Sequence, residues 1–202
     1  ARIAETQTGC ADVNTFEVSV LPAPETAEPN PIIICDTNQD GFFIVNLTSL
    51  TSELVTDTTD RIISFHTTLA AAENNSNPIP NASAYNANSK TVYARVENTI
   101  TGCYSTEAIS ITVNTLPVFT AISNYRICEN ASDGFGDFIF STKDAEILNG
   151  QAGKQTLYFL NQNDADNRTN AINKNLAYQN QSNPQTIFVR VENISDEDCY
   201  GT

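Results

Sequence analysis

The chain has 202 residues and a formal net charge of −14, with 24 acidic residues against 10 basic ones. This balance disfavours nucleic-acid binding, because too few cations are present to neutralise a phosphate backbone. No apolar run is long enough to span a bilayer, so we expect no membrane span in this segment. The sequence also has no Met and no signal peptide, which indicates a window from a longer mature polypeptide.

Two halves of the chain repeat each other. CDTNQDGFFIVNL begins at Cys35 and CENASDGFGDFIF begins at Cys128, a step of 93 residues (128 − 35). A step of this size corresponds to a whole domain rather than to one turn of a solenoid. We therefore predict three parts: the C-terminal strands of a preceding repeat with the start of a linker (1–24), a first complete repeat (25–117), and a second repeat that stops before its last strand (118–202).

Taken in chain order, strand-sized apolar runs alternate with turn signals. Two short runs (1–4 and 15–20) precede a proline-rich linker (21–31), which should hold neighbouring domains at a limited range of angles. In the two copies the predicted strands are 42–47, 61–68, 91–98 and 108–114, then 137–142, 155–161 and 186–193.

The segments between these strands contain no convincing long helix. SLTSELV (49–55) could form one helical turn, and 69–89 consists mostly of turn residues. The sequence therefore predicts an all-β protein of tandem immunoglobulin-like β-sandwich repeats joined end to end.

Five cysteines recur regularly, and the chain has no CxxC pair and a single His, which favours disulfides over metal ligands. Two sets of pairings fit the spacing. One lies within the copies (Cys35–Cys103 and Cys128–Cys199), and the other crosses the linkers (Cys10–Cys35 and Cys103–Cys128). A count of sheet crossings places the Cys35 loop at the same end of the domain as the turn before Cys103. It therefore favours the bonds within each copy.

The loop DTNQDG resembles the first half of a calcium-binding loop. Asp36, Asn38 and Asp40 alternate as oxygen ligands would, Gly41 occupies the sharp turn, and the Phe42 carbonyl is a candidate further ligand. The glutamate expected at the twelfth position of such a loop is missing. The alternative is an Asx-rich turn that satisfies its own backbone.

Completing this tentative Ca²⁺ site would need a residue from elsewhere, such as Glu97 or a residue of the neighbouring domain. In the second copy Glu129 and Asp133 keep two of the three side-chain positions, but Ala131 removes the third. We expect no calcium there.

Other polar residues in the strands have structural interpretations. Arg2, Arg95 and Arg190 share one position in their copies, which favours arginines that pair with a cross-strand acid or cover a sheet edge over a row that contacts glycans. His66 aligns with Leu160 in the second copy, and we expect it to be a solvated strand residue. Because no nucleophile, zinc or phosphate-binding motif is present, we expect no enzyme.

The combined motif is more specific than its parts. C-D-x-N-x-D-G-F is followed by AAE…NPI…Y, then by TVYARVEN-x-x-TGC, then by an alternating strand that ends in LP. This order resembles tandem repeats of large Bacteroidota surface proteins that are type IX secretion substrates, including flavobacterial gliding-motility adhesins. The resemblance implies an immunoglobulin-like repeat at the surface of a Gram-negative bacterium. The triplet that begins at Asp57 resembles the Bacteroidota O-glycosylation pattern, which makes Thr58 a candidate for a sugar.

We therefore expect a non-enzymatic repeat segment of a large secreted cell-surface adhesin, either a stalk or an adhesive fibre. Its partners would be neighbouring repeats of the same chain, and surface glycans or other cell-surface ligands are further candidates. The alternative is a spacer or carbohydrate-binding module of a secreted polysaccharide-degrading enzyme. The absence of Trp weighs against a glycan platform.

Overall fold

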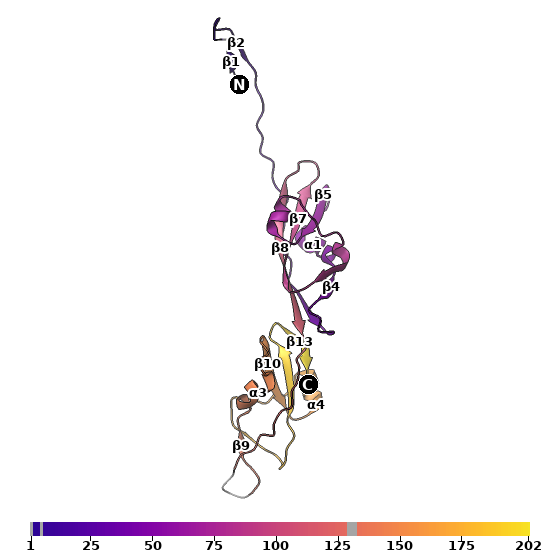
Figure 1. Ribbon diagram of the computed structural model, residues 1–202, viewed down its shortest axis with the longest axis vertical. Helices are drawn as coiled ribbons and strands as arrows, with labels where there is room; N and C mark the ends of the chain where they lie inside the picture. The colour runs from indigo at the N-terminus through magenta and orange to yellow at the C-terminus, as the bar shows by residue number, and fades with distance from the viewer. Residues whose placement is uncertain (1, 5, 129–132) are drawn as a thin grey trace.

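The computed structural model describes residues 2–4, 6–128 and 133–202 (Figure 1). The chain is elongated: a short strand pair at the N-terminus leads through an extended linker into two β-rich bodies placed end to end (Figure 1). Within the described ranges, no helix has the length and apolar character needed to cross a membrane.

The N-terminal strand pair is small. β1 (Arg2–Ala4) pairs antiparallel with β2 (Ala11–Val13). Residues 15–20, which we predicted as a strand, form none and are exposed. An isolated two-stranded hairpin is only marginally stable in water. It therefore provides little support for a third strand along residues 15–20.

The first repeat consists of two sheets. The larger has the order β3-β8-β7-β5, and the smaller pairs β4 with β6. Their bounds are β3 (Ile32–Asp36), β4 (Phe43–Val45), β5 (Arg61–His66), β6 (Tyr85–Ala87), β7 (Lys90–Asn98) and β8 (Tyr104–Thr115). All pairs are antiparallel except β3 with β8, which run parallel.

Both sheets contribute to one core, which confirms the all-β prediction. The buried apolar side chains come from β4, the helical turns after it, β5, β6, β7 and β8. The predicted helical turn is present as η1 (Leu47–Leu50) and α1 (Thr51–Leu54). The segment 69–89 contains two short helices that we did not predict, α2 (Leu69–Glu73) and η2 (Ala82–Ala84).

Most elements of the first repeat recur in the second repeat in the same order. Its sheets are β10-β12-β13 and the pair β9-β11. The bounds are β9 (Asp137–Phe138), η3 (Phe140–Lys143), α3 (Asp144–Leu148), β10 (Lys154–Phe159), α4 (Gln162–Asn167), β11 (Tyr178–Gln179), β12 (Phe188–Asn193) and β13 (Asp196–Gly201). β10 begins 93 residues after β5 (154 − 61), so the repeat read from the sequence is a structural repeat as well.

Three elements of the first repeat have no full counterpart in the second, namely β3, η2 and β8. Residues 125–128, which match the start of β3, form no strand, and β13 is half as long as β8.

His66 is fully buried, so our prediction of a solvated residue was wrong. Its Nε2 lies 2.9 Å from the Ser64 hydroxyl oxygen, and its Nδ1 lies 2.9 Å from the Ser76 carbonyl oxygen. The cause is α2, which packs against β5 and which the sequence did not reveal. Strand pairing also aligns His66 with Phe159 rather than with Leu160.

Candidate functional site at the junction between the repeats

A disulfide joins the two repeats. It connects Cys35 at the end of β3 to Cys199 in β13, across a sequence separation of 164 residues and a Cα–Cα distance of 5.2 Å. Cys199 is fully buried. By the chain-entropy relation, closing a loop of this length stabilises the folded state by about 5 kcal/mol.

This connectivity contradicts the predicted Cys35–Cys103 bond. β3 runs parallel to β8 with Cys35 opposite Asn114, at the far end of β8, whereas Cys103 precedes the first residue of that strand. Eleven residues of strand separate the two positions, about 36 Å at 3.3 Å per residue. A disulfide needs Cα atoms within about 7 Å. Our crossing count failed because it began at β4 and missed the parallel pairing of β3.

The other predicted bonds are wrong as well. Cys199 is bonded to Cys35, so the Cys128–Cys199 pair is absent. Cys10, Cys103 and Cys128 carry free thiols, which rules out both bonds across the linkers.

Hydrogen bonds surround the disulfide and also cross the junction. The Asn193 side-chain amide donates to the carbonyl oxygens of Thr115 (3.0 Å) and Cys199 (2.8 Å). The Lys154 ammonium donates to the Thr115 hydroxyl and to Asn193 Oδ1, both at 3.2 Å. Burial lowers the pKa of Lys154. The end of β8 is therefore held by polar groups of the second repeat.

Asn114 lies at the centre of this contact. Its Oδ1 accepts a hydrogen bond from the Ser195 hydroxyl (3.1 Å), and its carbonyl oxygen lies 3.7 Å from the Cys199 sulfur. In the first repeat the Cys103 sulfur lies at the same distance, 3.7 Å, from the Leu21 carbonyl oxygen. Leu21 precedes Asn114 by 93 residues (114 − 21). Thus Cys103 lies next to Leu21 as Cys199 lies next to Asn114, the equivalent residue one repeat later.

Each linker docks on the repeat that follows it. Gln151 exchanges two hydrogen bonds with the backbone of Val118, at 2.8 and 2.9 Å. The backbone N–H of Ser123 donates to Glu146, and that of Asn30 donates to Glu53 at the matching place of the first repeat. Lys143 donates a hydrogen bond to Glu146, which is the largest of the causes that lower the pKa of this carboxyl to about 2. The linkers are therefore attached segments and not free tethers.

An arginine cluster packs against β13, the strand that carries Cys199. The Arg190 guanidinium stacks on the Tyr200 ring at 3.4 Å and pairs with Glu192 at 2.7 Å. It also donates to the Glu197 carbonyl oxygen at 2.6 Å and, from the other side, to two carbonyl oxygens of α4. The buried Glu192 is further paired with Arg168 at 3.0 Å. The cluster thus links β12, α4 and β13.

The first repeat has the same cluster. Arg95 stacks on Tyr104 at 3.6 Å, pairs with Glu97 at 2.8 Å, and donates to two carbonyl oxygens of α2. The predicted acid partner is therefore present, although it lies two residues along the same strand and not across the sheet. Glu97, suggested as a calcium ligand, is engaged by Arg95. Arg2 lies exposed in β1.

The loop after β3 forms a series of Asx turns. Asp36 is 1% exposed, and its carboxylate accepts hydrogen bonds from the backbone N–H groups of Asn38, Gln39 and Gly41 at 2.7 to 3.2 Å. Asp40 accepts in the same way from the N–H of Phe42 at 2.8 Å. These carboxylates accept hydrogen bonds from backbone N–H groups of the loop itself, which is the arrangement that the Asx-turn alternative describes.

Calcium at Asp36, Asn38, Asp40 and the Phe42 carbonyl stays a prediction. Within the described part of the chain, no three His, Cys, Asp or Glu residues cluster to hold a metal. Glu129 and Ala131, on which the expectation for the second copy depends, lie outside the described residues.

Thr58 is exposed in the turn before β5, so a sugar would be accessible there. Asp57 accepts a hydrogen bond from the Thr59 N–H at 2.8 Å, which lowers the pKa of Asp57. Glycosylation of Thr58 stays a prediction.

The fold and the junction define a tandem-domain protein whose β-rich repeats are joined covalently. The family model described as "Flavobacterium inter-domain disulphide bond domain" matches residues 31–117 and again residues 124–202. The chain belongs to this family, and the bond between its two matched segments is of the kind that the description names. Comparisons with curated proteins and with solved structures gave no match. Tandem domains joined in this way indicate a multi-domain extracellular or cell-surface protein.

We predict that peptide mapping without reduction recovers one disulfide-linked peptide pair, which contains Cys35 and Cys199. Free thiols should be found at Cys10, Cys103 and Cys128. The C35S/C199S variant is the control and should yield no linked pair. Recovery of a Cys35–Cys103 peptide from freshly purified protein would contradict the parallel arrangement of β3 and β8.

A second prediction concerns the arginine clusters. Burial raises the pKa of Glu192, but hydrogen bonds from Arg168, Arg190 and Gln155 outweigh it and the net pKa is lowered. Because Glu192 is fully buried among two arginines, E192Q should cost roughly 3 kcal/mol at pH 7. The matched change E97Q should cost about 1 kcal/mol or less, because the side chain of Glu97 is 29% exposed.

The pH dependence follows from the lowered pKa of Glu192. A carboxyl whose folded pKa lies below its unfolded value stabilises the fold above the unfolded pKa, and this stabilisation is lost as the pH falls through the folded pKa. The difference between wild type and E192Q, measured by urea denaturation, should therefore shrink below pH 4.5. Equal costs for E192Q and E97Q at pH 7 would contradict the assigned roles.

Proposed function

We propose that this chain is a non-enzymatic segment of a large secreted adhesin and that it transmits tension. The adhesin would be of the gliding-motility type, exported by type IX secretion to the surface of a Gram-negative bacterium. In this function the immunoglobulin-like repeats are spacers that transmit tension along a fibre. The observation that carries the proposal is the Cys35–Cys199 bond, which runs from one repeat to the next rather than within either.

The bond changes how tension passes along the chain. When the two ends are pulled apart, force enters at Cys35, crosses the disulfide and leaves at Cys199. Residues 36–198 lie inside the closed loop and carry no tension. A fibre built in this way resists extension by covalent bonds, so its domains need not be exceptionally stable. Such a device suits a stalk that is stretched repeatedly, and it would bring no advantage to a soluble enzyme.

The free cysteines support a continuous array. Cys128 follows Cys35 by one repeat step of 93 residues (128 − 35), and it is exposed. Cys103 lies 3.7 Å from Leu21, as Cys199 lies from Asn114, the residue that pairs with Cys35. A cysteine of the preceding repeat that lies opposite Leu21, as Cys35 lies opposite Asn114, would therefore be close enough to bond to Cys103. We assign Cys103 to a bond with the preceding repeat and Cys128 to a bond with the following one.

The polar residues that could serve catalysis have structural partners. Arg95 and Arg190 hold α2 and α4, and His66 is fully buried between two oxygen atoms. These contacts support the non-enzymatic interpretation. Surface glycans and other cell-surface ligands stay candidate partners of the adhesin.

We expect thiol alkylation to distinguish the isolated segment from the parent protein. Without reduction the segment should take up three equivalents of iodoacetamide, at Cys10, Cys103 and Cys128. In the parent protein, taken directly from cells, Cys103 and Cys128 should be protected until a reductant is added. Modification of both residues in the unreduced parent protein would contradict a continuous disulfide-linked array.

Calcium binding at the loop after β3 is tested by thermal melting. If Ca²⁺ binds there, a hundredfold excess over Kd stabilises the protein by about 2.7 kcal/mol. D40N is a suitable control, because it removes one charge and keeps a side-chain oxygen for the Phe42 N–H. A melting temperature that is the same in calcium and in chelator, for protein shown to be metal-free, would leave the Asx turn as the only function of the loop.

A further inference from the structure

A lysine and an aspartate of the second repeat form the centre of a polar cluster. Asp144 is the first residue of α3, and its Oδ2 lies 2.7 Å from the Lys174 ammonium nitrogen. Its Oδ1 accepts hydrogen bonds from the hydroxyl groups of Thr156 and, at 2.8 Å, of Tyr158. Lys174 also donates to the carbonyl and hydroxyl oxygens of Thr156, both at 3.1 Å. One amine therefore lies beside one carboxyl oxygen, while two hydroxyl groups hold the other oxygen.

The first repeat shows that the fold does not need this cluster. At the four matching positions, one step of 93 residues earlier (144 − 51), it has Thr51, Ile63, Phe65 and Asn81. Phe65 is 3% exposed and belongs to the core, and Ile63 packs against that core. Apolar residues can often replace a buried ion pair without loss of stability. Packing alone therefore does not explain why the second repeat carries four polar groups at these positions.

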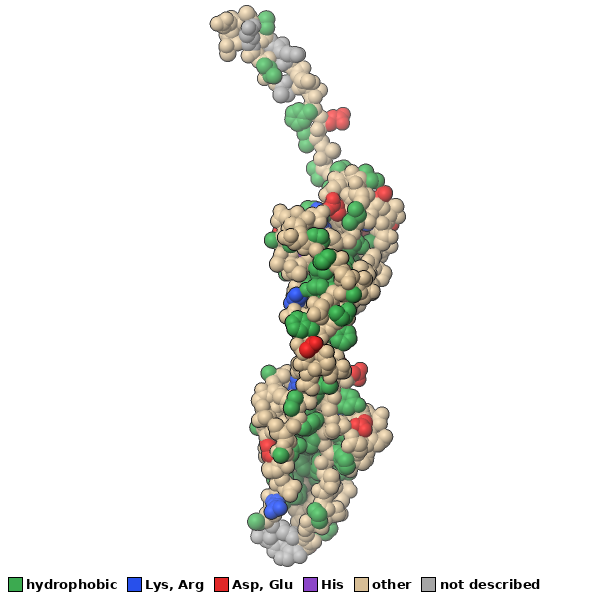
Figure 2. Space-filling model, turned by 45° about the vertical axis from the view of Figure 1, so that its right-hand side comes forward, with side chains coloured by type: hydrophobic (Ala, Val, Ile, Leu, Met, Phe, Trp, Pro, Cys, Tyr) green, Lys and Arg blue, Asp and Glu red, His purple; other side chains and the backbone are tan. Residues whose placement is uncertain are grey.

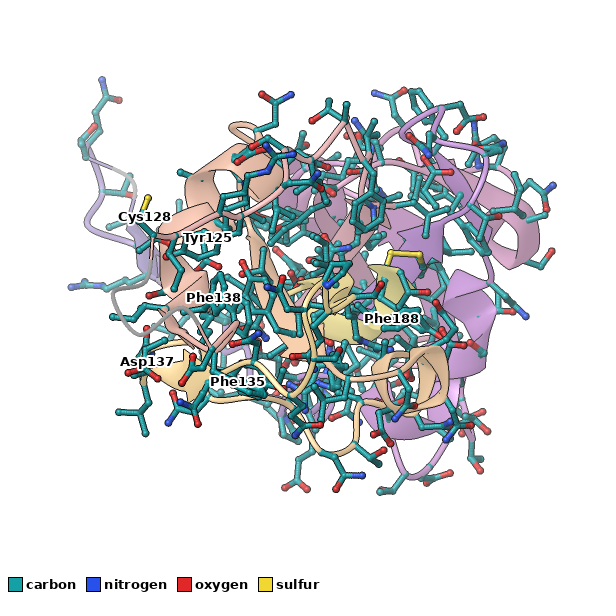
Figure 3. The ribbon with its side chains drawn as sticks, turned by 90° about the horizontal axis from the view of Figure 1, so that it is seen from below. Tyr125, Cys128, Phe135, Asp137, Phe138 and Phe188 are labelled. Atoms are coloured by element: carbon teal, nitrogen blue, oxygen red, sulfur yellow. A yellow bond between two sulfur atoms is a disulfide. The ribbon has the colours of Figure 1, made fainter. Side chains whose placement is uncertain are left out.

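The cluster borders an aromatic row in the core of the second repeat. The Tyr158 ring stacks on Phe140 with centroids 5.1 Å apart, and Phe138 and Tyr125 continue the row. Figure 3 shows Tyr125 and Phe138 side by side. Hydrophobic side chains also gather along this body in the space-filling view (Figure 2). Burial and the hydrogen bond to Asp144 raise the pKa of Tyr158, so its phenol group keeps its proton and donates it to the carboxylate.

We propose that Lys174 and Asp144 form an intramolecular isopeptide bond, an amide between the two side chains. The ammonium group first gives one proton to Oδ2, and the neutral amine then attacks the carboxyl carbon Cγ. A bond forms between Nζ and Cγ, and the bond between Cγ and Oδ2 breaks. Oδ2 takes a second proton from Nζ and leaves as water. An ammonium and a carboxylate thus become an amide and one water molecule, with no other reactant.

The contacts of the cluster favour this step. The amine and the carboxyl group are already held in contact, which removes most of the entropic cost of bringing them together. While Nζ adds to Cγ, negative charge develops on Oδ1, and the hydroxyl groups of Thr156 and Tyr158 already donate to this oxygen. Both of these residues are only 1% exposed, so they are shielded from competing water.

The bond would close a loop inside the second repeat. β10 and α4 lie between Asp144 and Lys174 in the sequence, so they would stay enclosed even after the Cys35–Cys199 disulfide is reduced. The first repeat has Asn81 at the position of the lysine and Thr51 at that of the aspartate, and it cannot form this bond. The inference does not depend on the adhesin function.

The mass of the intact chain, measured after reduction of the disulfide, tests the proposal. We expect the wild type to be lighter by one water molecule than the mass calculated from its sequence. Proteolysis should then yield a branched peptide that contains both Asp144 and Lys174. The matched control is K174R, which keeps a cation beside the carboxylate but has no ammonium group to form the amide. This variant should have its full calculated mass.

A second variant, Y158F, tests the hydroxyl donors. It introduces the residue that the first repeat has at the matching position, Phe65, so the core keeps a ring there. We expect freshly purified Y158F to contain a larger fraction of chains at the full calculated mass than the wild type does.

Two results would overturn the isopeptide bond. One is a wild-type chain at its full calculated mass, which would leave Lys174 and Asp144 as an ion pair only. The other is the loss of one water molecule from K174R as well, because this would indicate a succinimide at an aspartate. Equal cross-linked fractions in Y158F and the wild type would overturn the function assigned to the Tyr158 hydroxyl.

Discussion

The parallel pairing of β3 with β8 determines how this protein is held together. Because β3 runs alongside the last strand of its own repeat, its C-terminal residue reaches the exit end of the domain. An antiparallel first strand would have ended near the opposite pole. Cys35 is thereby carried to the place where the chain leaves the first repeat and the second repeat begins. The inter-repeat disulfide beside the Asn193–Thr115 contact follows from this placement.

The junction combines one covalent bond with polar contacts of modest individual strength. The disulfide limits how far the repeats can separate. The hydrogen bonds of Lys154 and Asn193 fix the position of the end of β8 against the second repeat. Behind them, Arg190 donates a hydrogen bond to the Glu197 carbonyl oxygen near the start of β13, the strand that carries Cys199. A hydrogen bond between neutral groups contributes roughly 1 kcal/mol and one from a charged group such as Lys154 about 1.5–3 kcal/mol, so the polar contacts orient the junction while the disulfide keeps it closed.

The repeat step, the β class and most strands could be predicted from the sequence, because apolar alternation and turn residues are local signals. The disulfide could not, because its partners depend on whether β3 pairs with β8 in a parallel or antiparallel sense. The PIIIC run has the same apolar character in either case. The burial of His66 was missed for a related reason: the short α2 helix gives little signal in a segment rich in Asn and Pro. The spacing of DTNQDG predicted a tentative calcium site with an Asx-rich turn as the alternative, and spacing alone does not distinguish a metal ligand from an Asx oxygen.

The motif TVYARVEN-x-x-TGC has a physical explanation that the sequence suggested only in part. Its arginine, glutamate and following tyrosine form a stacked and charged cluster in both repeats, at nearly equal distances. In the second repeat the arginine also donates to the Glu197 carbonyl oxygen, two residues before Cys199, so there the cluster contacts the strand that carries one half of the inter-repeat bond.

The central claim is that the disulfide carries tension past both folded repeats, and single-molecule pulling between the two chain ends tests it directly. The closed loop shields 163 residues (198 − 36 + 1), and at about 3.6 Å per residue their full extension would release up to roughly 590 Å. We expect the oxidised protein to release none of this length, whereas the C35S/C199S variant should unfold both repeats and release most of it. Unfolding of the oxidised protein with the same gain in length as the variant would contradict the account.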